Sequence, residues 1–120
     1  MKTLLVIDDD QNIRKIIKVQ LHKTELRILE AENQKTAFDL LGQEEIHVIL
    51  CDIKMKDTNG FIILKEIKDK YPSLPVIMLT GFIDKKVAER AEELGSFAFI
   101  TKPVRREKLL ESINSALESC

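Results

Sequence analysis

Short apolar runs alternate with amphipathic stretches along the whole chain. The runs are rich in Val, Ile and Leu, and they cover residues 3–7, 26–31, 46–51, 75–79 and 97–100. Between and after them, apolar residues recur every three or four positions, which is the period of a helix with one buried face. Short strands that alternate with helices predict an α/β fold.

Each amphipathic stretch carries one apolar stripe. The stripes are Ile13, Ile16, Ile17 and Leu21; Ala37, Phe38 and Leu41; Phe61, Leu64, Ile67 and Tyr71; Val87, Ala91 and Leu94; and Leu109, Ile113 and Leu117. Most strand runs are apolar on both faces, as expected for a parallel sheet covered by helices on each side. With right-handed crossovers, this predicts a doubly wound, five-stranded parallel sheet with five helices. Gly42, the segment 72–75 and Gly95 mark where we expect helices to end or strands to begin.

Composition narrows the class of protein. A chain of 120 residues with 44% hydrophobic residues buries one core but hardly two, so we expect a single domain over residues 1–120. The net charge of −1 provides no basic field for nucleic acid or anionic lipid, which favours a protein or a small anion as partner. No apolar run approaches the roughly 18 residues that span a bilayer, and Asp8 follows the first run too early for a signal peptide. We therefore expect a cytoplasmic protein in which Cys51 and Cys120 are reduced thiols.

Charged and polar residues follow four of the predicted strands. Asp8 and Asp9 follow the first strand, Asp52 the third, Thr80 the fourth and Lys102 the fifth. Because the carboxyl ends of parallel strands meet at one edge of a sheet, we expect these side chains to be neighbours. If the strand order is 2-1-3-4-5, which we assume here, the two N-terminal acids lie beside Asp52, and Thr80 and Lys102 lie on its other side.

This arrangement favours metal and phosphoryl chemistry. Three neighbouring carboxylates repel one another unless a cation offsets their charge. Mg²⁺ prefers hard oxygen ligands, which Asp9, Asp52, the backbone carbonyl of Lys54 and a phosphoryl oxygen would supply. Asp52 would then attack the phosphoryl group in line. Lys102 and the hydroxyl of Thr80 would stabilise the phosphoryl oxygens.

The site residues belong to five short segments. These are Val6-Ile7-Asp8-Asp9-Asp10, Cys51-Asp52-Ile53-Lys54-Met55, Asn59-Gly60, Val76-Ile77-Met78-Leu79-Thr80-Gly81 and Thr101-Lys102-Pro103. In order and spacing the segments resemble the receiver domains of bacterial two-component response regulators, and the resemblance covers essentially the whole chain. It implies a flavodoxin-like fold that works as a phosphorylation-activated signalling switch.

The resemblance also implies a role for each residue. Asp52 would accept a phosphoryl group from a sensor histidine kinase or a phosphotransfer protein, while Asp8 and Asp9 would form the acidic pair that holds Mg²⁺. Thr80 and Lys102 would then sense the phosphoryl group. Such a domain would not be an enzyme acting on other molecules, although it would assist its own phosphorylation and dephosphorylation.

A switch aromatic is implied three residues before the lysine, where this chain has Phe99, together with a cis peptide bond between Lys102 and Pro103. Movement of Thr80 would let Phe99 turn inward and reshape the face made by the fourth helix, the fifth strand and the fifth helix. That face carries the basic residues Lys85, Lys86, Arg90, Arg105 and Arg106. They would suit an acidic downstream partner, an output domain or a phosphorylation-dependent homodimer. The structural alternative for these basic residues is a solvated face. The structural alternative for Phe97 and Phe99 is that both are core residues.

The other assignments have structural alternatives as well. The acidic run after the first strand can cap the first helix, and we expect this role for Asp10. Asp52 can be an ordinary turn residue, and Lys102 a solvated loop lysine. Thr80 can end its strand with a structural hydroxyl bond. His22 and the other histidine, His47, have no partner at ligand spacing, which indicates surface or satisfied side chains.

Other classes of function compete with the switch. An aspartyl-nucleophile phosphatase usually needs a general acid two residues beyond its nucleophile, where this chain has Lys54. A flavodoxin-like electron carrier would bind phosphate after the first strand, where three aspartates repel it. A receiver fold used only as a constitutive docking module would keep the same residues with an idle site.

The loop after Asp52 departs from the family pattern. Lys56 stands where proline is usual and Asn59 where aspartate is common, so we expect a less rigid loop. Lys54 lies two residues beyond Asp52, and Phe82 lies two residues beyond Thr80. Both should border the path of water to an acyl phosphate. We hypothesise that their bulk and the lysine charge slow dephosphorylation.

Overall fold

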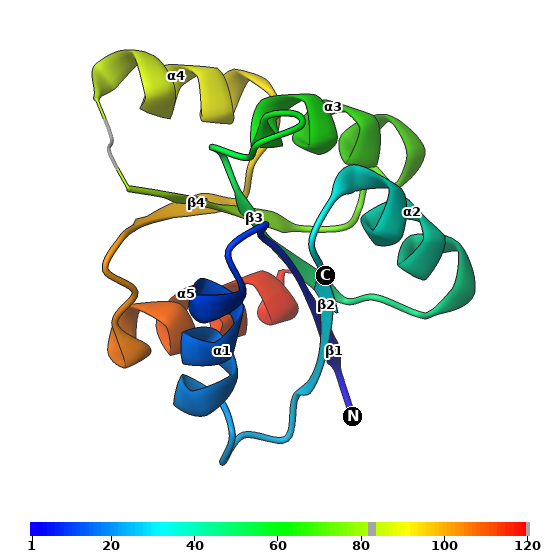
Figure 1. Cartoon of the computed structure of the whole chain (residues 1–120), viewed down its shortest axis with the longest axis vertical. Helices are drawn as coiled ribbons and strands as arrows, with labels where there is room; N and C mark the ends of the chain where they lie inside the picture. The colour runs from blue at the N-terminus through cyan, green and yellow to red at the C-terminus, as the bar shows by residue number, and fades with distance from the viewer. Residues whose placement is uncertain (82–83, 120) are drawn as a thin grey trace.

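The computed structural model describes residues 1–81 and 84–119. Strands and helices alternate in it: β1 (Thr3–Ile7), α1 (Gln11–Gln20), β2 (Arg27–Ala31), α2 (Gln34–Gln43), β3 (Val48–Asp52), α3 (Gly60–Lys70), β4 (Val76–Thr80), α4 (Lys85–Glu93), β5 (Ala98–Thr101) and α5 (Arg106–Glu118). The strands form one parallel sheet in the order β2-β1-β3-β4-β5. The predicted doubly wound sheet and the assumed strand order are therefore confirmed (Figure 1).

An apolar core lies on each face of the sheet. Helices α2, α3 and α4 cover one face, and α1 and α5 cover the other (Figure 1). Successive β1 residues alternate between the two cores, with Leu5 and Ile7 on the first side and Leu4 and Val6 on the second. Burial on both faces explains why the central strands β1, β3 and β4 are apolar almost throughout.

Some details of the helices differ from the sequence prediction. Ile16 is 44% exposed rather than buried, because Ile17 and Leu21 face the core and neighbouring helix positions lie roughly 100° apart. Ile63 is fully buried although it lies outside the predicted stripe, since α3 packs a broad face against the sheet. Gly42 does not end α2, which continues one residue beyond it.

The remaining breaks lie where the sequence predicts them. Gly95 follows α4 with φ at +89°, a left-handed conformation that glycine adopts without strain. Pro72 follows α3, and Pro75 directly precedes β4. Cys51 is a buried free thiol in β3. Among the described residues, no helix combines the length and apolar character needed to cross a membrane.

Candidate functional site

The carboxyl ends of β1 and β3 bring three acidic side chains together. Asp8 follows β1 and is fully buried, while Asp52 is the last residue of β3 and only 3% exposed. Asp9 is half-buried beside them. One carboxylate oxygen from each residue lies within 4.8 Å of the others. The structure thus brings these three acids into one cluster, as their positions at the ends of parallel strands predict.

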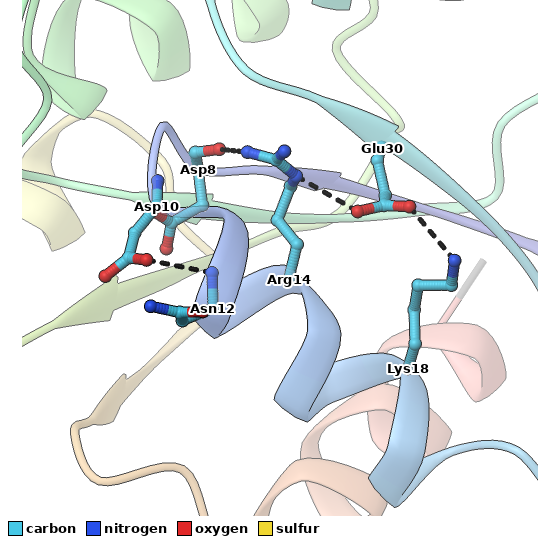
Figure 2. Close-up of polar contacts among 6 residues, drawn as sticks. All are labelled: Asp8, Asp10, Asn12, Arg14, Lys18 and Glu30. Atoms are coloured by element: carbon cyan, nitrogen blue, oxygen red, sulfur yellow. Dashed lines mark hydrogen bonds and ion pairs between the residues drawn. The ribbon is translucent and has the colours of Figure 1, made fainter.

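Hydrogen bonds order the loop between β1 and α1. The backbone N–H of Asp8 donates to Ala31 at 3.0 Å, which continues the contact with β2 beyond the end of β1. The N–H of Asp10 donates to Oδ1 of Asp8 at 2.9 Å. Asp10 in turn accepts a 2.9 Å hydrogen bond from the N–H of Asn12 and caps α1, as the sequence predicts (Figure 2).

The loop between β3 and α3 reaches the same cluster. The backbone N–H of Lys56 donates a 2.7 Å hydrogen bond to Oδ2 of Asp9. Proline at this position has no N–H, so the departure from the family pattern adds a donor to the site. Sequence reasoning missed this donor because every residue except proline has a backbone N–H, and no residue type signals its direction.

The start of α3 fixes the other end of that loop. Asn59 forms an isolated antiparallel β-bridge with Lys54. Its side-chain Oδ1 caps α3 by accepting a 3.1 Å hydrogen bond from the backbone N–H of Ile62. Gly60 packs so closely on the end of β3 that an added Cβ would stand 2.8 Å from the Cα of Ile53. Asn59, which stands where aspartate is common in the family pattern, is thus the N-cap of α3.

Lys102 supplies the cation of the site. Its Nζ lies 3.4 Å from Oδ1 of Asp52 and 3.8 Å from Oδ2 of Asp8, and its side chain is 25% exposed. The Lys102–Pro103 peptide bond is cis, the isomer that the resemblance implies. The backbone N–H of Lys102 donates to the carbonyl oxygen of Thr80 at 2.7 Å. These contacts do not fit a solvated loop lysine.

Burial controls the protonation of the acids. Desolvation raises the pKa of Asp8 to about 6, and the charges of Asp52 and Asp9 act in the same direction, while the N–H of Asp10 and Lys102 oppose it. Desolvation also raises the pKa of Asp52, against the lowering effects of Lys102 and of a backbone hydrogen bond from Lys54. Among the described residues, the buried Oδ2 of Asp8 has no hydrogen-bond partner. A cluster of carboxylates with such an oxygen fits a hard divalent cation.

Thr80 and Phe99 lie on neighbouring strands but in different surroundings. Thr80 ends β4 and is 6% exposed, whereas Phe99 lies in β5 and is 40% exposed. Phe97 and Phe99 together with Lys85 and Glu89 line a groove of about 420 Å³ between α4 and β5. The alternative that both phenylalanines are core residues is therefore wrong, since β5 is an edge strand whose outward positions are not covered.

The histidines lie outside the site. Nδ1 of His47 accepts a 2.9 Å hydrogen bond from the N–H of Thr3, at the opposite end of β1 from the acids. Nδ1 of His22 contacts the carbonyl oxygen of Val19 at 3.1 Å. Both side chains have local structural partners, as the sequence predicts. Phe82, named above beside the water path, lies outside the described residues.

Comparisons with known proteins identify the class. The family model for the response regulator receiver domain matches residues 4–114, and the chain belongs to this family. The receiver domain is the phosphorylation-activated switch of two-component response regulators, so the fold and function predicted from the sequence are confirmed at this level.

Individual relatives agree with this assignment. The chain is 33% identical over 113 residues to the response regulator protein PilR of Pseudomonas aeruginosa, a match that covers 94% of this chain and 25% of PilR. It is 31% identical over 112 residues to the DNA-binding transcriptional regulator NtrC of Escherichia coli, with coverage of 93% and 24%. It therefore spans about a quarter of the length of these relatives.

A solved structure shows the same architecture. The response regulator receiver domain protein from Clostridium thermocellum is 33% identical and superposes with a TM-score of 0.90 over 98% of this chain and 95% of the other. The match is nearly complete on both sides, so the described strands and helices share the architecture of that receiver domain.

Proposed function

We propose that Asp52 accepts a phosphoryl group in a Mg²⁺-dependent reaction, and that residues 1–120 form the receiver domain in which this happens. One observation carries the proposal: carboxylate oxygens of Asp8, Asp9 and Asp52 lie within 4.8 Å of one another, with the ammonium of Lys102 at 3.4 Å from Asp52. Hard anionic oxygens beside a fixed cation are the groups that phosphoryl transfer requires.

The acidic cluster fits Mg²⁺ by its chemistry. Asp8, Asp9, Asp52 and the backbone carbonyl of Lys54 would hold the ion. The bound ion supplies positive charge that offsets the carboxylates and the equatorial phosphoryl oxygens. Asp8 Oδ2, buried without a hydrogen-bond partner among the described residues, contributes negative charge on the inner side of the site.

Asp52 is the nucleophile in this proposal. One of its carboxylate oxygens attacks the phosphorus of a phosphohistidine, an O–P bond forms, and the N–P bond to the imidazole breaks. The electron pair of that bond stays on the imidazole nitrogen, which is then protonated. The product is an acyl phosphate, with Lys102 donating to one phosphoryl oxygen and the Thr80 hydroxyl to another.

The partners follow from this chemistry. A sensor histidine kinase or a phosphotransfer protein would supply the phosphoryl group in the cytoplasm. The chain then acts as a phosphoacceptor that assists its own phosphorylation and dephosphorylation, rather than as an enzyme on another substrate. Nothing in its charge favours direct contact with nucleic acid or membrane.

The output would pass from Thr80 to Phe99. When Thr80 turns toward the phosphoryl group, the space beside β5 lets the exposed Phe99 ring turn inward, and the face of α4, β5 and α5 changes shape. The new shape would bind a downstream protein or output domain, or a second copy of the chain. Arg106 is less available than the other basic residues of this face for contact with a partner, because its Nε donates to the carbonyl oxygen of Gln20 at the end of α1.

Intact-mass analysis tests the phosphoacceptor directly. The protein is incubated with a small-molecule phosphodonor with and without Mg²⁺, beside Asp52→Asn and the control Asp57→Asn, which changes an exposed acid of the same loop. We expect one Mg²⁺-dependent phosphoryl adduct that persists in the control and disappears in Asp52→Asn. Folded protein that forms no adduct would instead support a constitutive docking module.

A further inference from the structure

Arg14 connects the acidic loop to the neighbouring strand β2 (Figure 2). Its Nη1 donates a 2.6 Å hydrogen bond to the backbone carbonyl oxygen of Asp8, and its Nε donates a 3.0 Å hydrogen bond to Oε1 of Glu30. The Arg14 side chain is only 13% exposed, so water competes weakly for these bonds. The guanidinium thus links α1, the end of β1 and β2 at one point.

The carbonyl group of Asp8 lies beyond the regular sheet. The paired residues of β1 end at Ile7, and Asp8 extends the sheet only through its N–H, which donates to Ala31. Asp8 is fully buried. A buried carbonyl that loses a charged donor is costly, so the contact with Arg14 constrains the backbone at this position.

That backbone group joins the two acids. The carbonyl of Asp8 belongs to the peptide unit between Asp8 and Asp9, and this unit is planar. A donor that fixes the carbonyl therefore fixes the direction in which the chain leaves Asp8, and with it the place of the Asp9 carboxylate. Arg14 touches neither carboxylate and acts on their spacing through the main chain.

Glu30 holds the guanidinium in place. Partial burial raises the pKa of Glu30, but the hydrogen bonds and charges of Lys18 and Arg14 together lower it by more. The net shift of the pKa is downward, so Glu30 is an anion at neutral pH. Lys18 pairs with the second carboxylate oxygen of Glu30 (Figure 2), and the distance between Nζ and Oε2 is 3.2 Å. The planar fork of arginine donates in two fixed directions, whereas a lysine ammonium is a single centre on a flexible stem.

We propose that Arg14 is a positioning residue for the metal site, which holds the Asp8 carbonyl with Glu30 as its anchor and so sets the spacing of the Asp8 and Asp9 carboxylates for a divalent cation. The inference rests on the proposed function, because it takes these acids to bind Mg²⁺.

The sign of the effect separates positioning from simple electrostatics. Arg14 carries a positive charge near the site, so a purely electrostatic role would weaken the binding of a cation, and its removal would tighten that binding. A positioning role predicts the reverse. Loss of Arg14 weakens binding although a repulsive charge has been removed.

The test measures the Mg²⁺ dissociation constant of the unphosphorylated protein by titration calorimetry. The variants are Arg14→Met and Arg14→Lys. Lys18→Met is one control, because it removes the other cation on Glu30. Arg27→Met is a matched control, because Arg27 forms a 2.8 Å pair with Glu44 at the far end of β2. Hydrogen exchange of the Asp10 amide, which donates to Asp8 Oδ1, is measured on the same variants without metal.

We expect both Arg14 variants to bind Mg²⁺ about tenfold more weakly, as for the loss of a group that orients metal ligands, and to exchange the Asp10 amide faster. The two controls should keep the wild-type values. Binding as tight as in the wild type, or tighter, in folded Arg14→Met overturns the inference. If Arg14→Met does not fold, the same criterion applies to Arg14→Lys.

The metal-free measurement separates this inference from the proposed function. If the wild-type protein binds no Mg²⁺, the proposed function fails at that step. The hydrogen-exchange rate of the Asp10 amide still tests whether Arg14 orders the loop. Faster exchange in the Arg14 variants, and in no control, supports the positioning role, and unchanged exchange overturns it.

Discussion

The ammonium of Lys102 lies 3.4 Å from the carboxylate of Asp52, although Asp52 ends the central strand β3 and Lys102 follows the edge strand β5. The contact places a cation against the proposed nucleophile before any phosphoryl group is present. It also partly offsets a cluster of three acids, two of which are buried. Lys102 therefore has a structural role in the unphosphorylated protein as well as the proposed role in phosphoryl binding.

We predict that Lys102→Met destabilises the metal-free protein by about 2 kcal/mol, because the charged contact with Asp52 at a largely shielded site is lost and the acids keep no cation beside them. Urea unfolding at neutral pH measures the change. The same substitution should tighten Mg²⁺ binding, because it removes a competing cation. Lys108→Met, on the exposed side of α5, is the control and should change neither quantity. Equal stability of Lys102→Met and wild type would contradict this role.

A second prediction concerns pH. The pKa of Asp8 is raised from 3.8 to about 6, mainly by desolvation, so the folded state binds this proton more tightly than the unfolded state. The associated stability is fully present below about pH 3.8 and is lost as the pH rises through about 6. Without metal, the wild type should gain about 1–2 kcal/mol relative to Asp8→Asn between roughly pH 7.5 and pH 5.

Chemical unfolding of both proteins across this range tests the prediction. The comparison with Asp8→Asn removes the titration of the other carboxyl groups, which both proteins share. Saturating Mg²⁺ should reverse the trend, since the ion favours the carboxylate form. A wild-type protein that loses stability, relative to Asp8→Asn, as the pH falls from 7.5 to 5 would refute it.

The coupling of Thr80 to Phe99 gives a third prediction. Thr80→Ala should still form the phosphoryl adduct on Asp52, because the nucleophile and Lys102 are unchanged. The NMR signals of the Phe99 ring should no longer shift on phosphorylation, since the hydroxyl that draws β4 toward the phosphoryl group is missing. Thr101→Ala is the control, because Thr101 is the exposed register partner of Thr80 on β5. A normal ring response in Thr80→Ala would exclude the coupling.

We predict opposite effects of a glycine-to-alanine substitution at Gly60 and at Gly42, because their surroundings differ. A Cβ on Gly60 would meet the main chain of Asp52 and Ile53, so Gly60→Ala should cost about 2 kcal/mol or more and slow phosphorylation by displacing Asp52. Gly42 lies inside α2 with nothing within 4 Å of an added Cβ. Gly42→Ala should therefore stabilise the protein by about 0.5–1 kcal/mol without changing phosphorylation. Thermal unfolding and adduct formation measure both variants.

The sequence predicts the fold and the clustering of the acids for physical reasons. Continuous apolar strands require helices on both faces, and parallel strands bring Asp8, Asp9 and Asp52 to one edge. Strand order is different, because hydrophobic periodicity does not distinguish 2-1-3-4-5 from other orders. The order 2-1-3-4-5 is therefore an assumption at the level of the sequence, and the structure confirms it.

Other parts of the site depend on geometry that residue types do not encode. The donor to Asp9 is the main chain of Lys56, and the contact of Arg14 with Asp8 is to a carbonyl oxygen. Amphipathic spacing places Ile16 in the core, but the narrow buried face of α1 leaves it 44% exposed. These contacts and this exposure depend on the path of the backbone, so the pattern of side chains along the sequence does not predict them.

The last prediction concerns the lifetime of the acyl phosphate. Lys54, two residues beyond Asp52 in the chain, is exposed and lines a surface groove with Asp9, Asp10 and Met55, and we expect its side chain to border the approach of solvent to an acyl phosphate. Replacing Lys54 and Phe82 together by alanine should shorten the half-life of the phosphorylated protein, because water reaches the phosphorus more easily. Phosphate release after removal of the donor is timed at constant Mg²⁺. Lys108→Ala, an exposed lysine of α5 that does not line this groove, is the control and should leave the half-life unchanged. An unchanged half-life in the double variant would show that these side chains do not limit hydrolysis.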